Sequence, residues 1–598
     1  MSGSAANTLW ARSFTDELAR LGVREVALAP GSRSTPLVLA CARDARFRLR
    51  VHLDERSAAF FALGVGRGSG RPAAVITTSG TAAANLFPAV IEASQSAVPL
   101  LILTADRPHH LRDSDANQAI DQVRMYGRFA RNFFDIAPPS ISGPALRHLR
   151  TVAGRAVATA IGPTAGPVHL NFPFDTPLGP VDGFDDFAAE HPLAATGRPD
   201  GAPFVRISTG RRWPSPDDIE LLVAALESPR GAIVAGPASD PERVGAAVLR
   251  LAERIGFPVL ADPLSGARYR APGGVHRVAA YDLFLRDAAV ADLLAPTVIL
   301  RVGASPTSAA LQGWMLHHNG VPHVVVDGAR RWKDHGATAT HYIHADAATT
   351  LAAAAERATM SASDEWREEW QVAETAALGA LAADSGEAHE GDVLATVARV
   401  TPPEATLFVS SSMPVRDLDA FAHPREETLH VFGNRGASGI DGIVSTAFGI
   451  ASQRRTPTVC VLGDIAFFHD QNGLLWSRED DSAVVFVLVD NDGGGIFHML
   501  PIAEHEPHFS EYFATPHGLD LRHTADLHGV DFHEASVAEL GDAVTEALSQ
   551  GRTAVLRVRT DRSANRTRHL EVQEAVARSA REALAGRTYI ESSQDTDI

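Results

Sequence analysis

Lysine is almost absent from this 598-residue chain: Lys333 is the only one, and the other cationic residues are arginines. A P-loop needs a lysine after a glycine-rich turn, and Schiff-base enzymes need a lysine amine. Lys333 lies in the polar run 329–334, which offers neither context. The sequence therefore argues against Walker-type ATPases, pyridoxal-phosphate enzymes and class I aldolases.

Cysteine, basic blocks and long apolar runs are also scarce. Cys41 and Cys460 lie in apolar runs and provide neither a disulfide framework nor a zinc site. The chain has a formal net charge of −18 without a basic block, so we expect no nucleic-acid partner. No run reaches the ~18 apolar residues of a membrane helix, and the N-terminus lacks the pattern of a signal peptide. We therefore predict a cytoplasmic protein without membrane insertion.

Apolar runs alternate with helical patterns in three stretches of the chain. The predicted strands are 23–29, 50–53, 73–78, 99–104, 231–235, 258–261, 297–302, 323–326, 407–410, 429–432, 458–462, 484–489 and 554–558. Strands separated by helices of 10–15 residues are typical of parallel sheets that helices cover on both faces. We predict an α/β fold with three domains, each a largely parallel sheet flanked by helices. The predicted segments are a first domain over 1–183, a central domain over 200–355, a third domain over 385–585 and a disordered tail over 586–598.

Two predicted strands of the third domain end in residues with oxygen ligands. Asp464 follows Gly463 at the end of one strand, and Asn491 follows the next strand, just before a glycine run at 493–495. Mg²⁺ prefers oxygen ligands, usually one or two carboxylates together with phosphate oxygens. Glycines allow the backbone to approach a phosphate, and a helix that starts after Asp464 offers free N–H groups. Either motif alone is typical of an ordinary turn, but the pair predicts a site for magnesium and a diphosphate.

This pair resembles the signature of thiamin-diphosphate enzymes, in which an aspartate, an asparagine and a backbone carbonyl hold Mg²⁺ on the cofactor. The resemblance implies that Asp464, Asn491 and the carbonyl of Gly493 bind Mg²⁺, with Mn²⁺ as an alternative, and that thiamin diphosphate is the cofactor. Two positions depart from the usual signature. Ile465 stands where the family has a glycine, and Asp490 replaces the first of two asparagines.

Seven further segments resemble one branch of this family, the 2-succinyl-5-enolpyruvyl-6-hydroxy-3-cyclohexene-1-carboxylic acid synthases of menaquinone biosynthesis. They are 30–37, 54–56, 77–82, 104–108, 116–120, 434–442 and 493–501. The resemblance implies a transferase (carboligase) that decarboxylates 2-oxoglutarate and adds the succinyl-semialdehyde unit to C2 of isochorismate. The cofactor would supply the covalent chemistry, so no lysine is needed. It also implies a homodimer or a dimer of dimers, with the active site at a subunit interface.

The resemblance also assigns roles to single residues that bind the cofactor. Glu55, at a predicted strand end, matches the catalytic acid that contacts N1′ of the aminopyrimidine. Ile440 matches the apolar residue that supports the bent cofactor. Gln118 and Ser412 match polar positions close to the reacting carbon. The other implied cofactor contacts are Ser79, Gly80, Gly463 and Phe497. Ser412 is also implied to contact the cofactor.

Both implied substrates are multiply anionic, whereas the chain is acidic overall, so local guanidinium groups must bind their carboxylates. The implied substrate-binding residues are Ser32, Arg33, Arg107, Asn117, Gln118, Arg416 and Arg435, together with the apolar Ile496 and Leu500. The four arginines follow strand ends or glycine-rich turns, which favours a binding role over an ordinary surface position. A basic residue that some members carry in the central domain has no match in 303–310.

Two alternatives remain at the level of sequence. An acetolactate-synthase-like decarboxylase or carboligase would have a smaller pocket with fewer arginines. A catalytically silent thiamin-fold binding protein would have no reason to keep Glu55, Asp464 and Asn491 together. Seven histidines between His498 and His533 are irregularly spaced, and we interpret them as loop residues rather than metal ligands.

Overall fold

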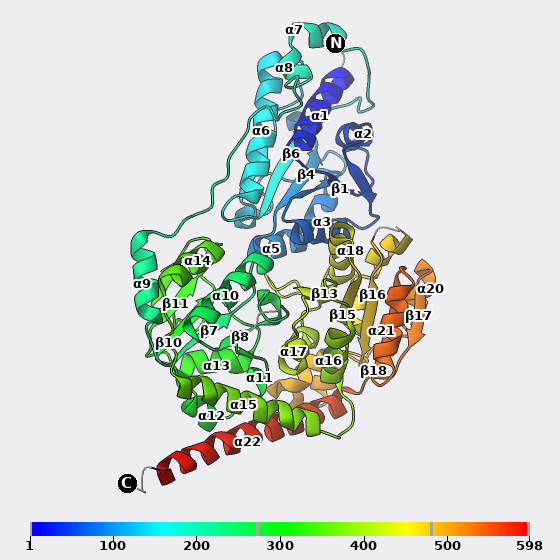
Figure 1. The fold of residues 1–598 in the computed structure, drawn as a ribbon. Helices are drawn as coiled ribbons and strands as arrows, with labels where there is room; N and C mark the ends of the chain where they lie inside the picture. The colour runs from blue at the N-terminus through cyan, green and yellow to red at the C-terminus, as the bar shows by residue number, and fades with distance from the viewer. Residues whose placement is uncertain (1–2, 271–273, 330, 479–481, 595–598) are drawn as a thin grey trace. The chain divides into compact units, whose positions relative to one another are not determined.

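Residues 3–270, 274–329, 331–478 and 482–594 are described by the computed structural model (Figure 1). They belong to two units, and the chain passes between these units several times. Unit 1 consists of Met1–Gly210, Asn434–Arg455 and His469–Ala483. Unit 2 consists of Arg211–Gly433, Thr456–Phe468 and Val484–Ile598.

Unit 1 contains one sheet of six parallel strands in the order β2-β1-β3-β4-β6-β5. The strands are β1 (Glu25–Leu28), β2 (Arg48–Val51), β3 (Ala73–Thr77), β4 (Leu100–Asp106), β5 (Asn132–Asp135) and β6 (Pro167–Pro173). The inner strands β1, β3, β4 and β6 are buried at every residue, as expected for a parallel sheet covered on both faces. The four strands predicted for this domain are confirmed, and β5 and β6 are additional to the prediction.

Helices cover both faces of this first sheet (Figure 1). One face packs against α1 (Gly3–Arg20), α2 (Thr35–Ala42) and α6 (Gly143–Ile161) through a shared apolar core. The other face carries α3 (Glu55–Ser69) and α5 (Phe87–Ser96). Three short helices complete the first 210 residues: α4 (Thr81–Ala84), α7 (Asp185–Glu190) and α8 (Pro192–Ala195).

A helix from a distant part of the sequence completes unit 1. Helix α18 (Ile443–Arg454) packs along α3, and glycines on both helices allow the two backbones to approach closely. A Cβ atom at Gly64 would lie 2.3 Å from the carbonyl oxygen of Thr446, and one at Gly449 would lie 2.1 Å from that of Phe61. Neither helix can accept a side chain at these positions without moving apart from the other.

Gly64→Ala is therefore expected to lower the stability of unit 1 by about 1–3 kcal/mol, the usual cost of overpacking. Helix propensity alone would raise the stability by up to ~1 kcal/mol, because alanine favours the helix more than glycine does. The matched control is Gly379→Ala in α15 (Asp364–Ala383), where a Cβ would meet no atom within 4 Å. Thermal unfolding midpoints at one protein concentration should fall for the first variant and stay equal or rise for the second. A midpoint raised in both variants would contradict the close packing.

Unit 2 contains two sheets, each with six parallel strands. The first has the order β12-β11-β10-β7-β8-β9, and the second has the order β14-β13-β15-β16-β18-β17. The strands of the first sheet are β7 (Gly231–Ala235), β8 (Val259–Ala261), β9 (Arg277–Val278), β10 (Val298–Val302), β11 (His323–Val326) and β12 (His341–Ile343). Those of the second are β13 (Thr406–Val409), β14 (His430–Phe432), β15 (Thr458–Gly463), β16 (Val485–Asp490), β17 (Asp531–Glu534) and β18 (Ala554–Arg559).

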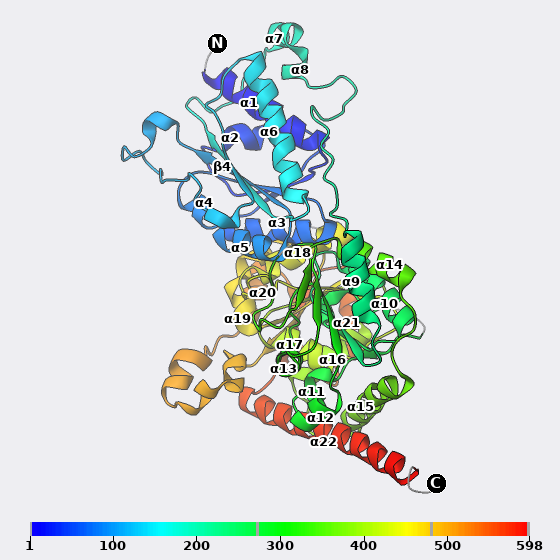
Figure 2. The same cartoon turned by 90° about the vertical axis from the view of Figure 1, so that its left-hand side faces the viewer.

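Helices surround both sheets of unit 2. Around the first sheet these are α9 (Pro216–Leu226), α10 (Pro241–Ile255), α11 (Tyr281–Phe284), α12 (Ala288–Leu293), α13 (Ala309–His317), α14 (Ala347–Arg357) and α15. Around the second they are α16 (Glu390–Val400), α17 (Met413–Phe421), α19 (Asp464–His469), α20 (Arg522–His528) and α21 (Leu540–Ser549). Figure 2 shows the long helix α22 (Arg562–Gln594) running past α11, α12 and α15.

The three sheets confirm the predicted fold class. The predicted disordered tail, 586–598, differs from the structure in part, because α22 continues to Gln594 and residues 595–598 lie outside the described residues. The polar stretch after residue 180 contains the short helices α7 and α8. Among the described residues, no helix combines the length and hydropathy needed to cross a lipid bilayer.

Candidate functional site

The carboxyl ends of β15 and β16 in unit 2 bring together two predicted site residues, Asp464 and Asn491, and their polar neighbour Asp490. The two strands pair in parallel, with Gly463 opposite Val489. Asp464 and Asp490 therefore leave the same edge of the sheet, and Asn491 follows directly. All three side chains are at least nine-tenths buried. The predicted pair of strand ends thus forms one local site.

Asp464 is held by backbone N–H groups on two sides. Its Oδ1 accepts a hydrogen bond from Ile465 N at 2.6 Å, and its Oδ2 accepts one from Gly493 N at 2.8 Å. Burial raises the pKa of Asp464 above its ordinary value, and the charge of Asp490 raises it further, while the two backbone bonds act in the opposite direction. A cation bound at this carboxylate would lower the pKa again.

Asn491 presents one free acceptor to this site. Its Nδ2 donates to Glu390 Oε1 at 2.9 Å, whereas its buried Oδ1 has no hydrogen-bond partner within the described part of the chain. A buried carbonyl oxygen without a partner costs about 1–3 kcal/mol. An oxygen-binding cation at this position would satisfy it, so the donor set fits Mg²⁺.

Gly493 can adopt its conformation because it has no side chain. Its φ is +142°, and a Cβ would lie 2.2 Å from the carbonyl oxygen of Ala514. Its own carbonyl accepts from Gly495 N at 3.0 Å, which uses one of two lone pairs. The predicted third ligand therefore still has an acceptor site available.

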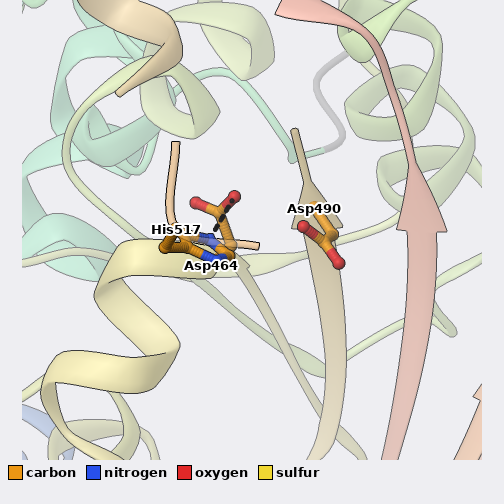
Figure 3. A group of neighbouring side chains, drawn as sticks. All are labelled: Asp464, Asp490 and His517. Carbon is orange, nitrogen blue, oxygen red and sulfur yellow. Dashed lines mark ion pairs between the residues drawn. The ribbon is translucent and has the colours of Figure 1, made fainter. Parts of the chain in front are cut away.

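His517 is a neighbour that the sequence did not single out, and it forms a second candidate donor set with Asp464 and Asp490 (Figure 3). Leu519 N donates to His517 Nδ1 at 3.0 Å, so in the neutral ring the proton sits on Nε2. That nitrogen lies 3.3 Å from Asp464 Oδ2. A protonated nitrogen does not ligate a metal, so we interpret His517 as a polar neighbour of Asp464 rather than as a ligand.

Asp490 is likewise occupied by partners within the protein. Its Oδ1 accepts from Asp492 N at 3.3 Å, and its Oδ2 lies 3.5 Å from Arg557 Nη1. The guanidinium compensates the charge of this carboxylate. The geometry therefore favours Asp464, Asn491 and the Gly493 carbonyl as the metal-binding set over the set with Asp490 and His517.

In unit 1, the start of α3 places Glu55. Asp54 caps this helix, because its Oδ1 accepts from Arg56 N at 2.8 Å and from Ser57 N at 3.4 Å. Glu55 Oε2 accepts from Asn85 Nδ2 at 3.4 Å, and the side chain is half-buried. The acid thus projects from a rigid first turn.

Hydrogen bonds to the segment 469–476 hold the residues around Glu55 in place. Arg56 Nη2 donates to the carbonyl oxygen of His469 at 2.6 Å. Asn472 Nδ2 donates to Asp54 Oδ2 at 3.0 Å, and Ser57 Oγ donates to Asp470 Oδ1 at 3.2 Å. Asp470 also accepts from the backbone N–H and the hydroxyl of Ser445 on α18. The first turn of α3 is therefore fixed by residues that lie more than 380 positions later in the chain.

Asp470 should make the stability of unit 1 depend on pH. Burial raises the pKa of Asp470 from 3.8 to about 6. Because the folded state binds the proton more tightly, the stabilising contribution is complete below pH ~3.8 and disappears as the pH rises through about 6. The asparagine of the Asp470→Asn variant cannot ionise. Its unfolding midpoint should therefore rise relative to that of the wild type between pH 4 and 7, by an amount equivalent to up to about 3 kcal/mol in the free energy of unfolding. Parallel midpoint–pH curves for the two proteins would contradict this assignment.

The predicted residues at the ends of β3 and β4 contact one another. Arg107 Nη1 donates to Ser79 Oγ and Nη2 to the carbonyl oxygen of Asn117, both at 2.6 Å. Gln118 Nε2 donates to the carbonyl oxygen of Ser79 at 3.0 Å. Gly80 has a φ of +84°, and a Cβ there would lie 3.0 Å from Gln118 Cγ. Five predicted residues thus form one polar cluster.

Arg33 contributes a second guanidinium to this region of unit 1. Its Nη1 donates to the carbonyl oxygen of Phe174 at 2.9 Å. Burial lowers the pKa of Arg33, and the positive charge of Arg107 lowers it further. Two guanidinium groups that repel each other are suited to an anionic ligand, which would offset the repulsion.

The remaining predicted residues divide between the units. In unit 1, Arg435 lies directly before Gly436 and Ala437 in the chain. The backbone N–H groups of these two residues donate to the buried carboxylate of Glu92 at 2.9 and 2.7 Å. In unit 2, Ser412 starts α17 with a φ of +73°, and its carbonyl oxygen accepts from Arg416 Nη1. Ser32 and Ile440 belong to unit 1, whereas Ile496, Phe497 and Leu500 belong to unit 2.

Comparison with known proteins follows the same three-part division. Models of the thiamine pyrophosphate enzymes match residues 10–125 (N-terminal TPP binding domain), 216–409 (middle domain) and 418–558 (C-terminal TPP binding domain). Benzoylformate decarboxylase from Polynucleobacter necessarius has a similar solved structure, with a TM-score of 0.69, 18% identity and coverage of 92% of this chain and 98% of that one. At this identity the likeness supports the fold alone.

Curated relatives are more similar in sequence. The 2-succinyl-5-enolpyruvyl-6-hydroxy-3-cyclohexene-1-carboxylate synthase of Halobacterium salinarum is 46% identical over 581 residues, which cover 94% of this chain and 97% of the relative. The synthase of the same name from Roseiflexus sp. is 43% identical over 589 residues, covering 96% and 98%. The chain therefore belongs to the 2-succinyl-5-enolpyruvyl-6-hydroxy-3-cyclohexene-1-carboxylate synthase family of thiamine pyrophosphate enzymes.

Proposed function

We propose that this protein is a thiamin-diphosphate-dependent carboligase that decarboxylates 2-oxoglutarate and adds the succinyl-semialdehyde unit to C2 of isochorismate. The observation that carries the proposal is the oxygen-lined site at the paired ends of β15 and β16, where Asp464 follows one strand and the buried Oδ1 of Asn491, after the other, has no hydrogen-bond partner within the described residues. The names of the relatives support the choice of reaction. The proposal includes a cytoplasmic location and the domain boundaries given above.

Asp464, Asn491 and the carbonyl of Gly493 would hold Mg²⁺, or Mn²⁺ in its place, together with the diphosphate of the cofactor. Thiamin diphosphate, when bound, supplies the carbanion chemistry that no side chain of the protein provides. Ser79, Gly80, Ser412, Ile440, Gly463 and Phe497 are the further residues proposed to contact it. Glu55 would hold and release the activating proton at its carboxylate oxygens.

The arginines would bind the carboxylates of the two substrates. Arg33 and Arg107 form one cationic pair in unit 1, supported by the polar cluster around Ser79. Arg416 and Arg435 are the other proposed carboxylate ligands. Ser32, Asn117, Gln118, Ile496 and Leu500 complete the proposed substrate contacts, with Gln118 and Ser412 assigned to the region of the reacting carbon.

We further propose that the active site forms between two copies of the chain, in a homodimer or a dimer of dimers. The first domain of one subunit would then face the third domain of the other, as the family resemblance implies. Light scattering together with activity at graded dilution tests this point. A monomer that retains full activity would contradict it.

The reaction is tested with purified protein, thiamin diphosphate, Mg²⁺, 2-oxoglutarate and isochorismate. We expect CO₂ release that matches the loss of isochorismate absorbance, and neither signal without the cofactor. Pyruvate offered in place of 2-oxoglutarate should give little turnover, because it lacks the second carboxylate. Faster turnover with pyruvate would favour an acetolactate-synthase-like activity, and no turnover with either would favour a silent binding protein.

A further inference from the structure

Glu390 is a buried residue whose carboxylate contacts Asn491, one of the residues of the candidate metal site. It begins α16 and is 2% exposed. Its Oε1 accepts hydrogen bonds from Asn491 Nδ2 and from Thr560 Oγ1, both at 2.9 Å. Its backbone N–H donates to Asn565 Oδ1 at 3.0 Å. Residues after β18 and at the start of α22 thus converge on Glu390 at the start of α16, and Glu390 contacts the side chain of Asn491.

The contact with Glu390 decides which end of the Asn491 amide is bound by the protein and which end is left without a partner among the described residues. The terminal torsion of asparagine has two nearly equivalent orientations, which exchange the oxygen and the nitrogen. Glu390 Oε1 accepts from Thr560 Oγ1 as well as from Asn491, and an oxygen that acts as an acceptor selects the orientation that brings Nδ2 toward itself. The other orientation would place Asn491 Oδ1 against Glu390 Oε1, and the two acceptors would repel each other. Glu390 therefore leaves Oδ1 free on the opposite side of the amide.

Thr560 stabilises the Glu390 carboxylate in the position that selects this orientation of Asn491. Its hydroxyl donates to the same oxygen, Oε1, that accepts from Asn491. The hydroxyl therefore holds this carboxylate oxygen in place, and the bond from the Glu390 backbone N–H to Asn565 holds the start of α16. Outer contacts of this kind fix the orientation of metal ligands and commonly change metal affinity by about 10–100-fold when they are removed.

We propose that Glu390 is a positioning residue, which orients the Asn491 carboxamide so that Oδ1 meets the metal ion and which thereby sets the metal affinity of the site. The inference rests on the proposed function, because it takes Asn491 as a ligand. It adds a residue outside the family signature, one that contacts the ligand rather than the metal.

The test is Mn²⁺ binding to the full chain with thiamin diphosphate and without substrates, followed by the electron paramagnetic resonance signal of free Mn²⁺. Glu390→Ala should raise the Kd for Mn²⁺ by about 10–100-fold. Glu390→Gln keeps an oxygen that can accept from both Asn491 and Thr560, so its Kd should stay within about threefold of the wild-type value. Glu390→Met removes the acceptor at similar volume and serves as the second test variant if the alanine variant does not fold.

The matched control is Glu374→Gln, another buried carboxylate of unit 2 that accepts from the backbone of Ala279 and Ala280. This variant should leave the Kd for Mn²⁺ unchanged. Wild-type affinity in a folded Glu390→Ala or Glu390→Met protein would overturn the positioning role, as would equal losses in Glu390→Gln and Glu390→Met. Failure of the wild type itself to bind Mn²⁺ with thiamin diphosphate would instead count against the proposed function.

Discussion

Glu55→Gln is expected to lower kcat by about 10²–10⁴-fold, the range over which a positioned acid or base contributes to catalysis. Glutamine fits the same space and can still accept from Asn85, but it cannot gain or lose the proton. Asp54 would still cap α3, so the helix should begin at the same residue. Steady-state kinetics with saturating cofactor and substrates measures the loss. Binding of thiamin diphosphate, followed by quenching of tryptophan fluorescence, should change by less than about threefold.

The control for this variant is Glu253→Gln, an exposed glutamate on α10 that contacts none of the proposed site residues. It should retain wild-type kcat and KM. A Glu55→Gln protein with the wild-type rate would show that another group moves the proton. Loss of cofactor binding together with loss of rate would instead assign Glu55 a role in binding.

Asp464→Asn should weaken metal binding by roughly 100-fold or more, because even the loss of an outer contact typically costs 10–100-fold. The substitution keeps the shape of the side chain and removes its negative charge. The amide also replaces one of the two oxygens that accept from Ile465 N and Gly493 N, so the turn around the site should loosen. Titration calorimetry with Mg²⁺ and thiamin diphosphate measures the affinity.

Asp490→Asn is the informative companion to this variant. It restores the asparagine pair of the usual family signature, and we expect less than about a fivefold change in Kd if Asp464, Asn491 and Gly493 are the ligands. Equal losses in both variants would favour the alternative set with Asp490 and His517.

The convergence of Asp464 and Asn491 could be predicted from sequence because parallel strands end at one edge of a sheet. Asp464 and Asn491 follow β15 and β16, and the pairing of these strands brings them together. The orientation of the Asn491 amide could not be predicted, since it depends on Glu390, 101 residues earlier. At the start of α16, a glutamate suggests no more than a favourable interaction with the helix dipole.

Strand β6 shows why part of the first sheet was missed. It is bounded by Pro167 and Pro173 and carries His169 and Asn171, so no apolar run marks it. In the fold, both side chains lie 2.8 Å from the hydroxyl oxygen of Thr104 on β4. The hydrogen-bond partners of these two polar side chains lie 49 or more positions away, and no local pattern contains that information.

The pairing of α3 with α18 has a consequence for synthesis of the chain on the ribosome. Helix α3 emerges early, but the helix that covers its glycine face is translated roughly 20–80 s later at ~5–20 residues per second. During this interval the nascent first domain exposes Gly64 and its apolar neighbours to water. The first turn with Glu55 acquires its final contacts only after Asp470 and Asn472 have been made. Unit 1 is therefore completed late, after the central domain has left the exit tunnel.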